Sequence, residues 1–244
     1  MRKITINLAA VAAFCIVVAS PALVSSSCAT PKTEQEDTTI IREDSGITAL
    51  KYSSPEVPTS IEFCGKTIDL SRFDRHERMD RELLAFTYMH STSLQMLKKA
   101  NRYFPIVEPI LKENGIPDDF KYLMVIESNM NPTARSSAGA AGLWQFMQGT
   151  GRDYGLEVNN NVDERYHIEK ATRAACRYLK DAYAKYKDWV AVAASYNAGQ
   201  ARIASQLAKQ DVDDSLDLQL VEETARYVYR ILAAKQLFSA PTTF

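Results

Sequence analysis

Hydrophobic residues recur at helical spacing through most of the chain after residue 70. The clearest stretch covers residues 171–186, where alanine, leucine and tyrosine return every three or four positions. Similar patterns over 83–101, 189–196 and 222–237 predict further helices. Residues 61–70 fit a short hairpin, and no period-two alternation follows them. The pattern predicts one mainly α domain over residues 61–244 with a short N-terminal extension.

Prolines and glycines mark helix boundaries in the middle of the chain. Pro105 and Pro109 predict the start of a helix that ends at Gly115. The next helix is expected to open at Pro117 and to stop before Pro132, because the residue preceding a proline is pushed out of the helical region.

The first 28 residues have the form of a signal peptide. Arg2 and Lys3 precede an apolar run over 4–18, and small residues follow. That run is shorter than the roughly 20 residues that a membrane-spanning helix needs. Three serines before Cys28 resemble a lipoprotein signal, although an aliphatic residue usually stands where Ser25 does. Lipid attachment at Cys28 and plain secretion both remain open, and residues 29–60 resemble a flexible linker.

Composition narrows the class of protein. The chain has 244 residues, of which 46% are hydrophobic, and this is enough for a buried core. Its net charge of −1 argues against a nucleic-acid-binding protein. After the leader only Cys64 and Cys176 remain, either as a disulfide or as two buried thiols. The three histidines are far apart, so we expect no metal and no cofactor.

Glu127 breaks the apolar stripe of its predicted helix. Phe120, Leu123 and Met124 form one face, and Glu127 falls on that face near the C-terminal end. Burial and the negative helix end both disfavour a charged carboxylate, so its pKa should be raised. A carboxyl group that stays protonated near neutrality can protonate a glycosidic oxygen. The alternative is a partly exposed glutamate, or one paired with an arginine such as Arg135.

Several short segments with unusual composition follow Glu127. Residues 138–142 have almost no side-chain bulk and lead into the sequence Leu-Trp-Gln-Phe-Met. Gln145 there could hydrogen bond a sugar, or it could simply pack or cap. Tyr196 and Asn197 close an apolar helix before Gly199, and Tyr227 lies on the last helix. Taken singly, each of these segments fits a packing role better than a functional one.

Together these segments resemble the four ordered motifs of family 1 lytic transglycosylases. The matching stretches are Ile-Glu-Ser at 126–128, Gly-Leu-Trp-Gln-Phe-Met at 142–147, Ala-Ser-Tyr-Asn-Ala-Gly at 194–199, and Glu-Thr with Tyr-Val at 223–228. Flanking segments at 131–136 and 162–165 are similar to the branch of membrane-bound lytic murein transglycosylase D. The resemblance covers roughly residues 100–237.

The resemblance implies a goose-type-lysozyme-like fold with a sugar-binding groove. It makes Glu127 the catalytic acid and base, and it implies that Glu223 is a buried supporting group. It assigns substrate binding to the following residues: Ser136, Gly142, Gln145, Tyr196, Asn197 and Tyr227. Ser137, Gln148 and Ser195 depart from the usual pattern, which bears on fine substrate preference.

The implied activity is cleavage of the bond between N-acetylmuramic acid and N-acetylglucosamine in peptidoglycan, leaving a 1,6-anhydro end. Ordinary glycosidases use two carboxylates, and the motifs supply one. A hydrolytic muramidase on the same scaffold and a non-catalytic wall-binding lipoprotein are the alternatives. We expect an exported, periplasmic and monomeric protein, with or without a membrane lipid, that binds glycan strands and no nucleic acid.

Overall fold

The computed structural model of the chain describes residues 55–244, which lie within one compact unit spanning Tyr52–Phe244. The expected signal peptide, most of the expected linker and Cys28 lie outside the described residues. The domain boundaries expected from the sequence stay predictions. Within residues 55–244 no helix is long and apolar enough to cross a membrane.

The structure begins with the expected hairpin. Strands β1 (Ser60–Phe63) and β2 (Lys66–Asp69) pair antiparallel, with Ile61 opposite Ile68. Cys64 and Gly65 form the turn with φ values of 53° and 80°, a conformation typical of two-residue hairpin loops. The hairpin anchors itself to the helices through Phe63, whose ring centroid lies 5.9 Å from that of Phe120.

Helices make up most of the described chain, and this confirms the mainly α prediction. The eight α-helices of residues 55–244 are α1 (Phe73–Tyr88), α2 (His90–Glu113), α3 (Phe120–Ser128), α4 (Gln148–Asp153), α5 (Ile168–Tyr186), α6 (Trp189–Ala198), α7 (Gln200–Lys209) and α8 (Glu222–Ser239). Short 3₁₀ turns lie at Glu164–Tyr166, Ser215–Asp217 and Pro241–Thr243.

The expected helix start at Pro105 is wrong. Helix α2 passes through both Pro105 and Pro109 without a break. Each proline removes one backbone hydrogen bond. Tyr103, Val107 and Leu111 continue one buried face across them, and that burial stabilises the helix despite the lost hydrogen bonds. The predicted end is confirmed, because Gly115 follows the helix with a φ of 66°.

Helices α4 and α7 were not predicted. Both are short, with six residues in α4 and ten in α7, and each contains a single buried residue, Gly151 in α4 and Ile203 in α7. Helix α7 starts directly after Gly199, which the sequence pattern had indicated only as a helix stop. The helices predicted over 171–186, 189–196 and 222–237 are confirmed as α5, α6 and α8.

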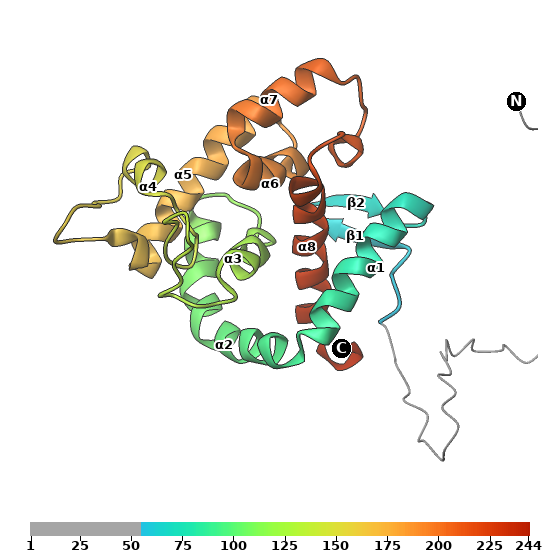
Figure 1. Cartoon of the computed structure of the whole chain (residues 1–244), viewed down its shortest axis with the longest axis horizontal. Helices are drawn as coiled ribbons and strands as arrows, with labels where there is room; N and C mark the ends of the chain where they lie inside the picture. The colour runs from blue at the N-terminus through green and yellow to red at the C-terminus, as the bar shows by residue number, and fades with distance from the viewer. Residues whose placement is uncertain (1–54) are drawn as a thin grey trace, which may run out of the picture. The chain divides into compact units, whose positions relative to one another are not determined.

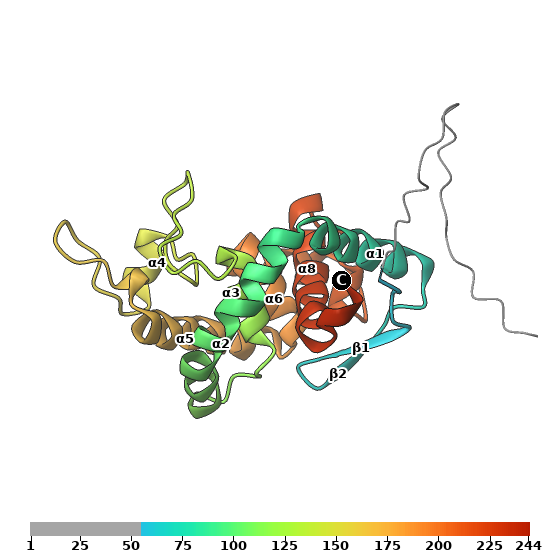
Figure 2. The same ribbon diagram turned by 90° about the horizontal axis from the view of Figure 1, so that it is seen from below.

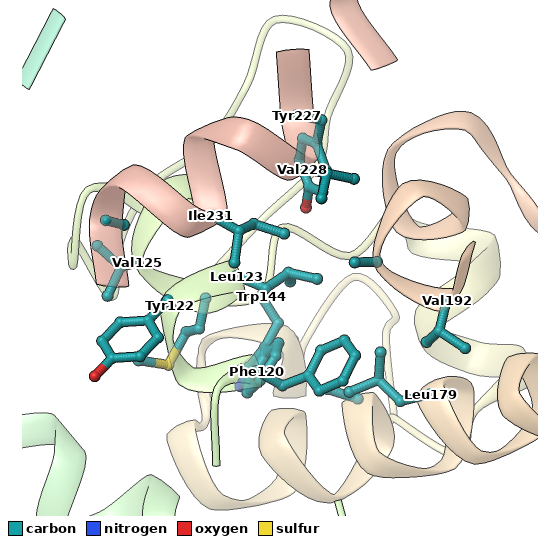
Figure 3. Packing of buried hydrophobic residues seen from close by; sticks show 14 of the residues in the cluster. Phe120, Tyr122, Leu123, Val125, Trp144, Leu179, Val192, Tyr227, Val228 and Ile231 are labelled. Carbon is teal, nitrogen blue, oxygen red and sulfur yellow. The ribbon is translucent and has the colours of Figure 1, made fainter. Parts of the chain in front are cut away.

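Helix α8 packs against three other helices, including α3. Figures 1 and 2 both show it between α1 and α3, and it also packs against α6. Figure 3 shows Leu123 of α3, Ile231 of α8 and Trp144 from the segment before α4 in one hydrophobic cluster. The short helix α3 is therefore held on several sides, which fixes the position of its C-terminal end.

The two cysteines are free thiols, so the disulfide alternative is not formed. Cys176 is fully buried on α5, whereas Cys64 is partly exposed in the hairpin turn. Burial raises the pKa of the Cys176 thiol to about 11, and it raises that of Cys64 further still. Both side chains therefore stay protonated and unreactive at neutral pH.

Candidate active site

Glu127 lies in the last turn of α3, on the stripe that the sequence predicted. Phe120, Leu123 and Met124 on that stripe are completely buried, and Glu127 is half-buried. The chain then turns away sharply, because Asn129 and Met130 both adopt left-handed conformations, with φ values of 48° and 59°. A carboxyl group thus lies at the C-terminal end of an otherwise apolar helix face.

Burial raises the pKa of Glu127 from its ordinary value of 4.5 to about 7. Two neighbours on α8 act in the opposite direction. The hydroxyl of Tyr227 donates a hydrogen bond to Oε1 of Glu127, and the positive charge of Arg230 favours the carboxylate. Arg135, the partner considered from the sequence, is exposed and makes no ion pair with Glu127. Glu127 can therefore hold and release a proton near neutral pH.

Tyr227 and Tyr196 flank Glu127 from two different helices. Tyr227 is almost completely buried on α8, and this burial, with a further contribution from the charge of Glu127, raises its pKa well above the usual 10. Burial, and after it the charge of Glu127, also raises the pKa of Tyr196 on α6. The structure thus brings together three of the predicted site residues.

The hydroxyl of Tyr196 also supports the segment before α4. It donates a 2.8 Å hydrogen bond to the backbone oxygen of Trp144. Its ring packs near Trp144, Phe146 and Tyr178, with centroid distances of 6.5, 6.1 and 5.1 Å. Tyr196 is therefore a structural support of this segment as well as a neighbour of Glu127.

Gly142 allows the segment to approach the backbone of Arg165. A Cβ atom at Gly142 would lie 1.9 Å from the backbone oxygen of Arg165, and its φ is 77°. The buried guanidinium of Arg165 donates from Nη1 to the backbone oxygens of Gly139 and Phe146, at 2.8 and 2.9 Å. Asp163 holds that guanidinium in an ion pair of 2.7 Å. Gly142 therefore has a packing role here, whatever it contributes to binding.

Gln145 and Ser136 shape the same loop. The amide nitrogen of Gln145 donates to the backbone oxygens of Gly142 and Ala134, at 2.8 and 3.2 Å, while its own φ is 46°. The amide oxygen of Gln145 makes no hydrogen bond within residues 55–244. The hydroxyl of Ser136 is exposed and accepts from the backbone N–H of Ala140 at 3.0 Å. Neither residue bonds Glu127, Tyr196 or Tyr227.

Asn197 links α6 to the start of α8. Its side-chain oxygen accepts a 2.8 Å hydrogen bond from the hydroxyl of Thr224. The expectation that Glu223 is buried is wrong, because Glu223 is exposed in the first turn of α8. Its neighbour Thr224 is buried instead.

A buried carboxylate near the site was missed by the sequence analysis. Glu82 of α1 has a side chain only 2% exposed and accepts a 2.6 Å hydrogen bond from Nε of Arg226. Nε of Arg230 lies 3.5 Å from its other oxygen. The sequence contained one indication that Glu82 is buried, namely that it shares a helix face with the apolar residues Met79, Leu83 and Phe86. Its partners could not be predicted, because they lie on a helix more than a hundred residues further along the chain.

Among the described residues, no second carboxylate interacts with Glu127. Its pKa is set by burial, Tyr227 and Arg230, with no contribution from another acid. Asp163 pairs with Arg165, and Glu164 pairs with Lys170 and accepts from the backbone of Glu157. No group of three potential metal ligands occurs in residues 55–244.

Comparison with known proteins points to one family. Residues 105–217 match the family described as Transglycosylase SLT domain. Membrane-bound lytic murein transglycosylase D of Escherichia coli (strain K12) is 30% identical over 166 residues, which are 66% of this chain and 36% of that protein. Peptidoglycan transglycosylase gp16 of Escherichia phage T7 is 31% identical over 123 residues, 49% of this chain and 9% of that protein.

A solved structure is also similar, an inactive mutant of lytic transglycosylase Slt from Pseudomonas aeruginosa. It shares 22% sequence identity, with a TM-score of 0.48 over 57% of this chain and 24% of that one. This chain spans about a third of the length of the Escherichia coli relative, 36%. The family match includes Glu127, the loop around Gly142 and Tyr196, and it ends before Tyr227.

Proposed function

We propose that this chain is a family 1 lytic transglycosylase that cleaves the glycan strands of peptidoglycan, supported by the match of residues 105–217 to the SLT domain and by the similarity to transglycosylase D. The bond broken joins N-acetylmuramic acid to N-acetylglucosamine, and the product ends in 1,6-anhydro-N-acetylmuramic acid. The observation that supports this most is the half-buried Glu127, with a pKa near 7 and no carboxylate partner.

One carboxyl group suffices for both proton transfers of such a reaction. Protonated Glu127 gives its proton to the glycosidic oxygen as the bond from that oxygen to C1 of the muramic sugar breaks. The resulting carboxylate takes the proton of the C6 hydroxyl of the same sugar, whose oxygen bonds to C1. The proton returns to Glu127, and no water is consumed.

The surrounding residues supply the other requirements of this mechanism. Tyr227 donates to the carboxylate and so stabilises it between the two transfers. Tyr196, Asn197 and Gly142 hold the helices and the loop that border Glu127. Ser136 and the free amide oxygen of Gln145 are proposed to contact sugar at the outer part of the groove.

Analysis of the products tests the proposed function directly. Purified wall digested with the protein should release muropeptides whose mass is lower by one water than the hydrolytic products, because the ring closes internally. Mass spectrometry separates the candidates. Reducing muramic ends would indicate a hydrolytic muramidase, and wall binding with no released product would indicate a non-catalytic protein.

Tyr227→Phe should lower the rate of lysis roughly tenfold or more and shift its dependence on pH. The variant loses a hydrogen bond to a charged group, an interaction that contributes about 1.5–3 kcal/mol. The bond lowers the pKa of Glu127, so its loss raises that pKa and moves the alkaline decline in rate to higher pH. Initial lysis rates between pH 5 and pH 9 measure both effects.

Tyr229→Phe is the matched control for this substitution. Tyr229 is a buried tyrosine of the same helix, and its hydroxyl makes no hydrogen bond in the described part of the chain. This variant should keep the rate and the pH profile of the wild type. Equal effects of the two substitutions would show that Tyr227 only packs.

We propose a periplasmic location with a lipid on Cys28, supported by the leader pattern and by a relative that is named membrane-bound. Cys28→Ala should then move the protein from the membrane fraction to the soluble fraction. Fractionation with mass analysis of the mature N-terminus measures this. An N-terminus without lipid and unchanged fractionation would indicate simple secretion.

A further inference from the structure

A cavity of about 300 Å³ lies beside Glu127, between α1, α3 and α8. Ile126 and Asn129, the residues on either side of Glu127 and Ser128, form one part of its lining. Arg226 and Arg230 of α8 form another part, with Glu82 of α1 between them. Tyr227, the hydrogen-bond donor to Glu127, directly follows Arg226 in the chain. Glu127 does not line the cavity, but the charge of Arg230, which does, acts on the Glu127 carboxyl, so the cavity lies near the proposed catalytic group.

The arginines give this cavity a net positive charge. Two guanidinium groups share the single carboxylate of Glu82, whose side chain is 2% exposed. The side chains of Arg226 and Arg230 are 29% and 39% exposed, so both reach solvent from the cavity wall. The buried carboxylate holds the two cations close together, and these three side chains carry a net charge of +1.

Most donors of the two arginines are free. Arg226 donates from Nε alone, and Arg230 approaches Glu82 at 3.5 Å without forming a hydrogen bond. The terminal nitrogens of both guanidiniums have no hydrogen-bond partner in residues 55–244. A guanidinium with free terminal nitrogens binds a carboxylate through two parallel hydrogen bonds.

We infer that Arg226 and Arg230, held by Glu82, form a subsite for a carboxylate on the muramic side of the glycan. This inference rests on the proposed function. N-Acetylglucosamine has no acidic group. Each muramic residue has a lactyl carboxyl, which is either free or joined to a peptide stem that has carboxylates of its own. An arginine pair next to Glu127 would thus distinguish wall glycan from neutral glycans of similar backbone and help to align the strand.

Arg230→Gln tests the subsite with little risk to the fold. Its contact with Glu82 is long, whereas loss of Arg226 would leave the buried carboxylate without its close partner. Both the substitution and its controls are placed in full-length Glu127→Gln protein, so that the glycan is bound without being cleaved. Melting temperatures confirm folding, and Arg230→Lys serves as a second variant that keeps the charge but lacks the planar fork.

Three glycans of equal length serve as ligands: strands with peptide stems, strands whose stems have been removed to leave the lactyl carboxyl, and neutral N-acetylglucosamine oligomers. Arg230→Gln should weaken binding of carboxylated strands roughly tenfold and leave the neutral oligomer unaffected. The affinity of Arg230→Lys for carboxylated strands should lie between those of the protein with Arg230 and of Arg230→Gln. A loss confined to the stem-free strands identifies the lactyl carboxyl, which is a neutral amide wherever a stem is attached. A loss confined to the stem-bearing strands identifies a carboxylate of the stem, and a loss on both shows that the subsite accepts either carboxylate.

Arg81→Gln is the matched control. Arg81 also bridges α1 and α8, through a 2.6 Å ion pair with Glu222, but it does not line the cavity. Equal losses for Arg81→Gln and Arg230→Gln, or an equal loss on all three glycans, would overturn the subsite. Absence of lysis by the wild-type protein would refute the proposed function instead, and the binding comparison would still decide the subsite.

Discussion

Glu127→Gln should abolish lysis of peptidoglycan and should also make the folded protein more stable at alkaline pH. The loss of activity follows from the lack of a second carboxylate, since general acid–base catalysis contributes about 10²–10⁴-fold and no neighbour can replace it. Glutamine keeps the size of the side chain and can still accept a hydrogen bond from Tyr227.

The gain in stability follows from the raised pKa of Glu127. Below pH 4.5 the carboxyl of Glu127 is protonated in both the folded and the unfolded chain, so it does not lower the free energy of unfolding. As pH rises from 4.5 to 7 the unfolded chain ionises first, and the wild type loses stability until both states are ionised above about pH 7. One pKa unit corresponds to about 1.4 kcal/mol, so the full loss is about 3 kcal/mol.

Denaturant unfolding at pH 4 and pH 8 measures this effect. The variant and the wild type should have similar stability at pH 4, and the variant should be more stable by about 3 kcal/mol at pH 8. Glu113→Gln is the control, because Glu113 is an exposed partner of Arg173 far along α2. A folded Glu127→Gln protein with near-normal lysis would rule out the assignment of the acid and base.

Gly142→Ala should destabilise the protein strongly and disrupt the loop beside the site. The new methyl group would lie 1.9 Å from a backbone oxygen of Arg165, and the flanking backbone cannot rotate away as a side chain would. The left-handed conformation adds about 1–2 kcal/mol for a residue with a Cβ. A total loss of about 3–5 kcal/mol in the free energy of unfolding is expected, at the upper end for single substitutions.

Gly139→Ala separates the two contributions. Gly139 lies in the same loop with a φ of 89°, and a Cβ atom there would meet nothing within 4 Å. It should therefore cost only the backbone strain, about 1–2 kcal/mol. Thermal and denaturant unfolding of both variants give the comparison. Similar losses for the two would mean that the close approach to Arg165 contributes nothing.

The sequence pattern predicted the helices that bury many apolar residues. Helices α5, α6 and α8 were expected because buried alanine, leucine and aromatic residues recur along them. Helix α2 was misjudged at Pro105, because local rules penalise proline and cannot include the burial of Val107 and Leu111 by other helices. Helix α7 was missed because it has only ten residues and starts directly after Gly199, which the pattern indicated as a helix stop.

The sequence by itself determined which residue is chemically unusual. A glutamate on an apolar stripe is recognisable from spacing alone, and so is the chain of motifs that resembles the transglycosylases. It also indicated that the loop at 138–142 allows a close approach of its backbone to a neighbour, since only small residues occur there. It could not identify the backbone of Arg165 as the neighbour.

Only the tertiary structure decided the surroundings of Glu127. Tyr227 lies a hundred residues further along the chain, and Glu82 and Arg226 are separated by 144. Spacing along one helix says nothing about which turn of another helix packs against it, because that depends on how all the apolar faces fit together. For the same reason the exposed position of Glu223 and the buried position of Thr224 became known only when α8 was packed between α1 and α3.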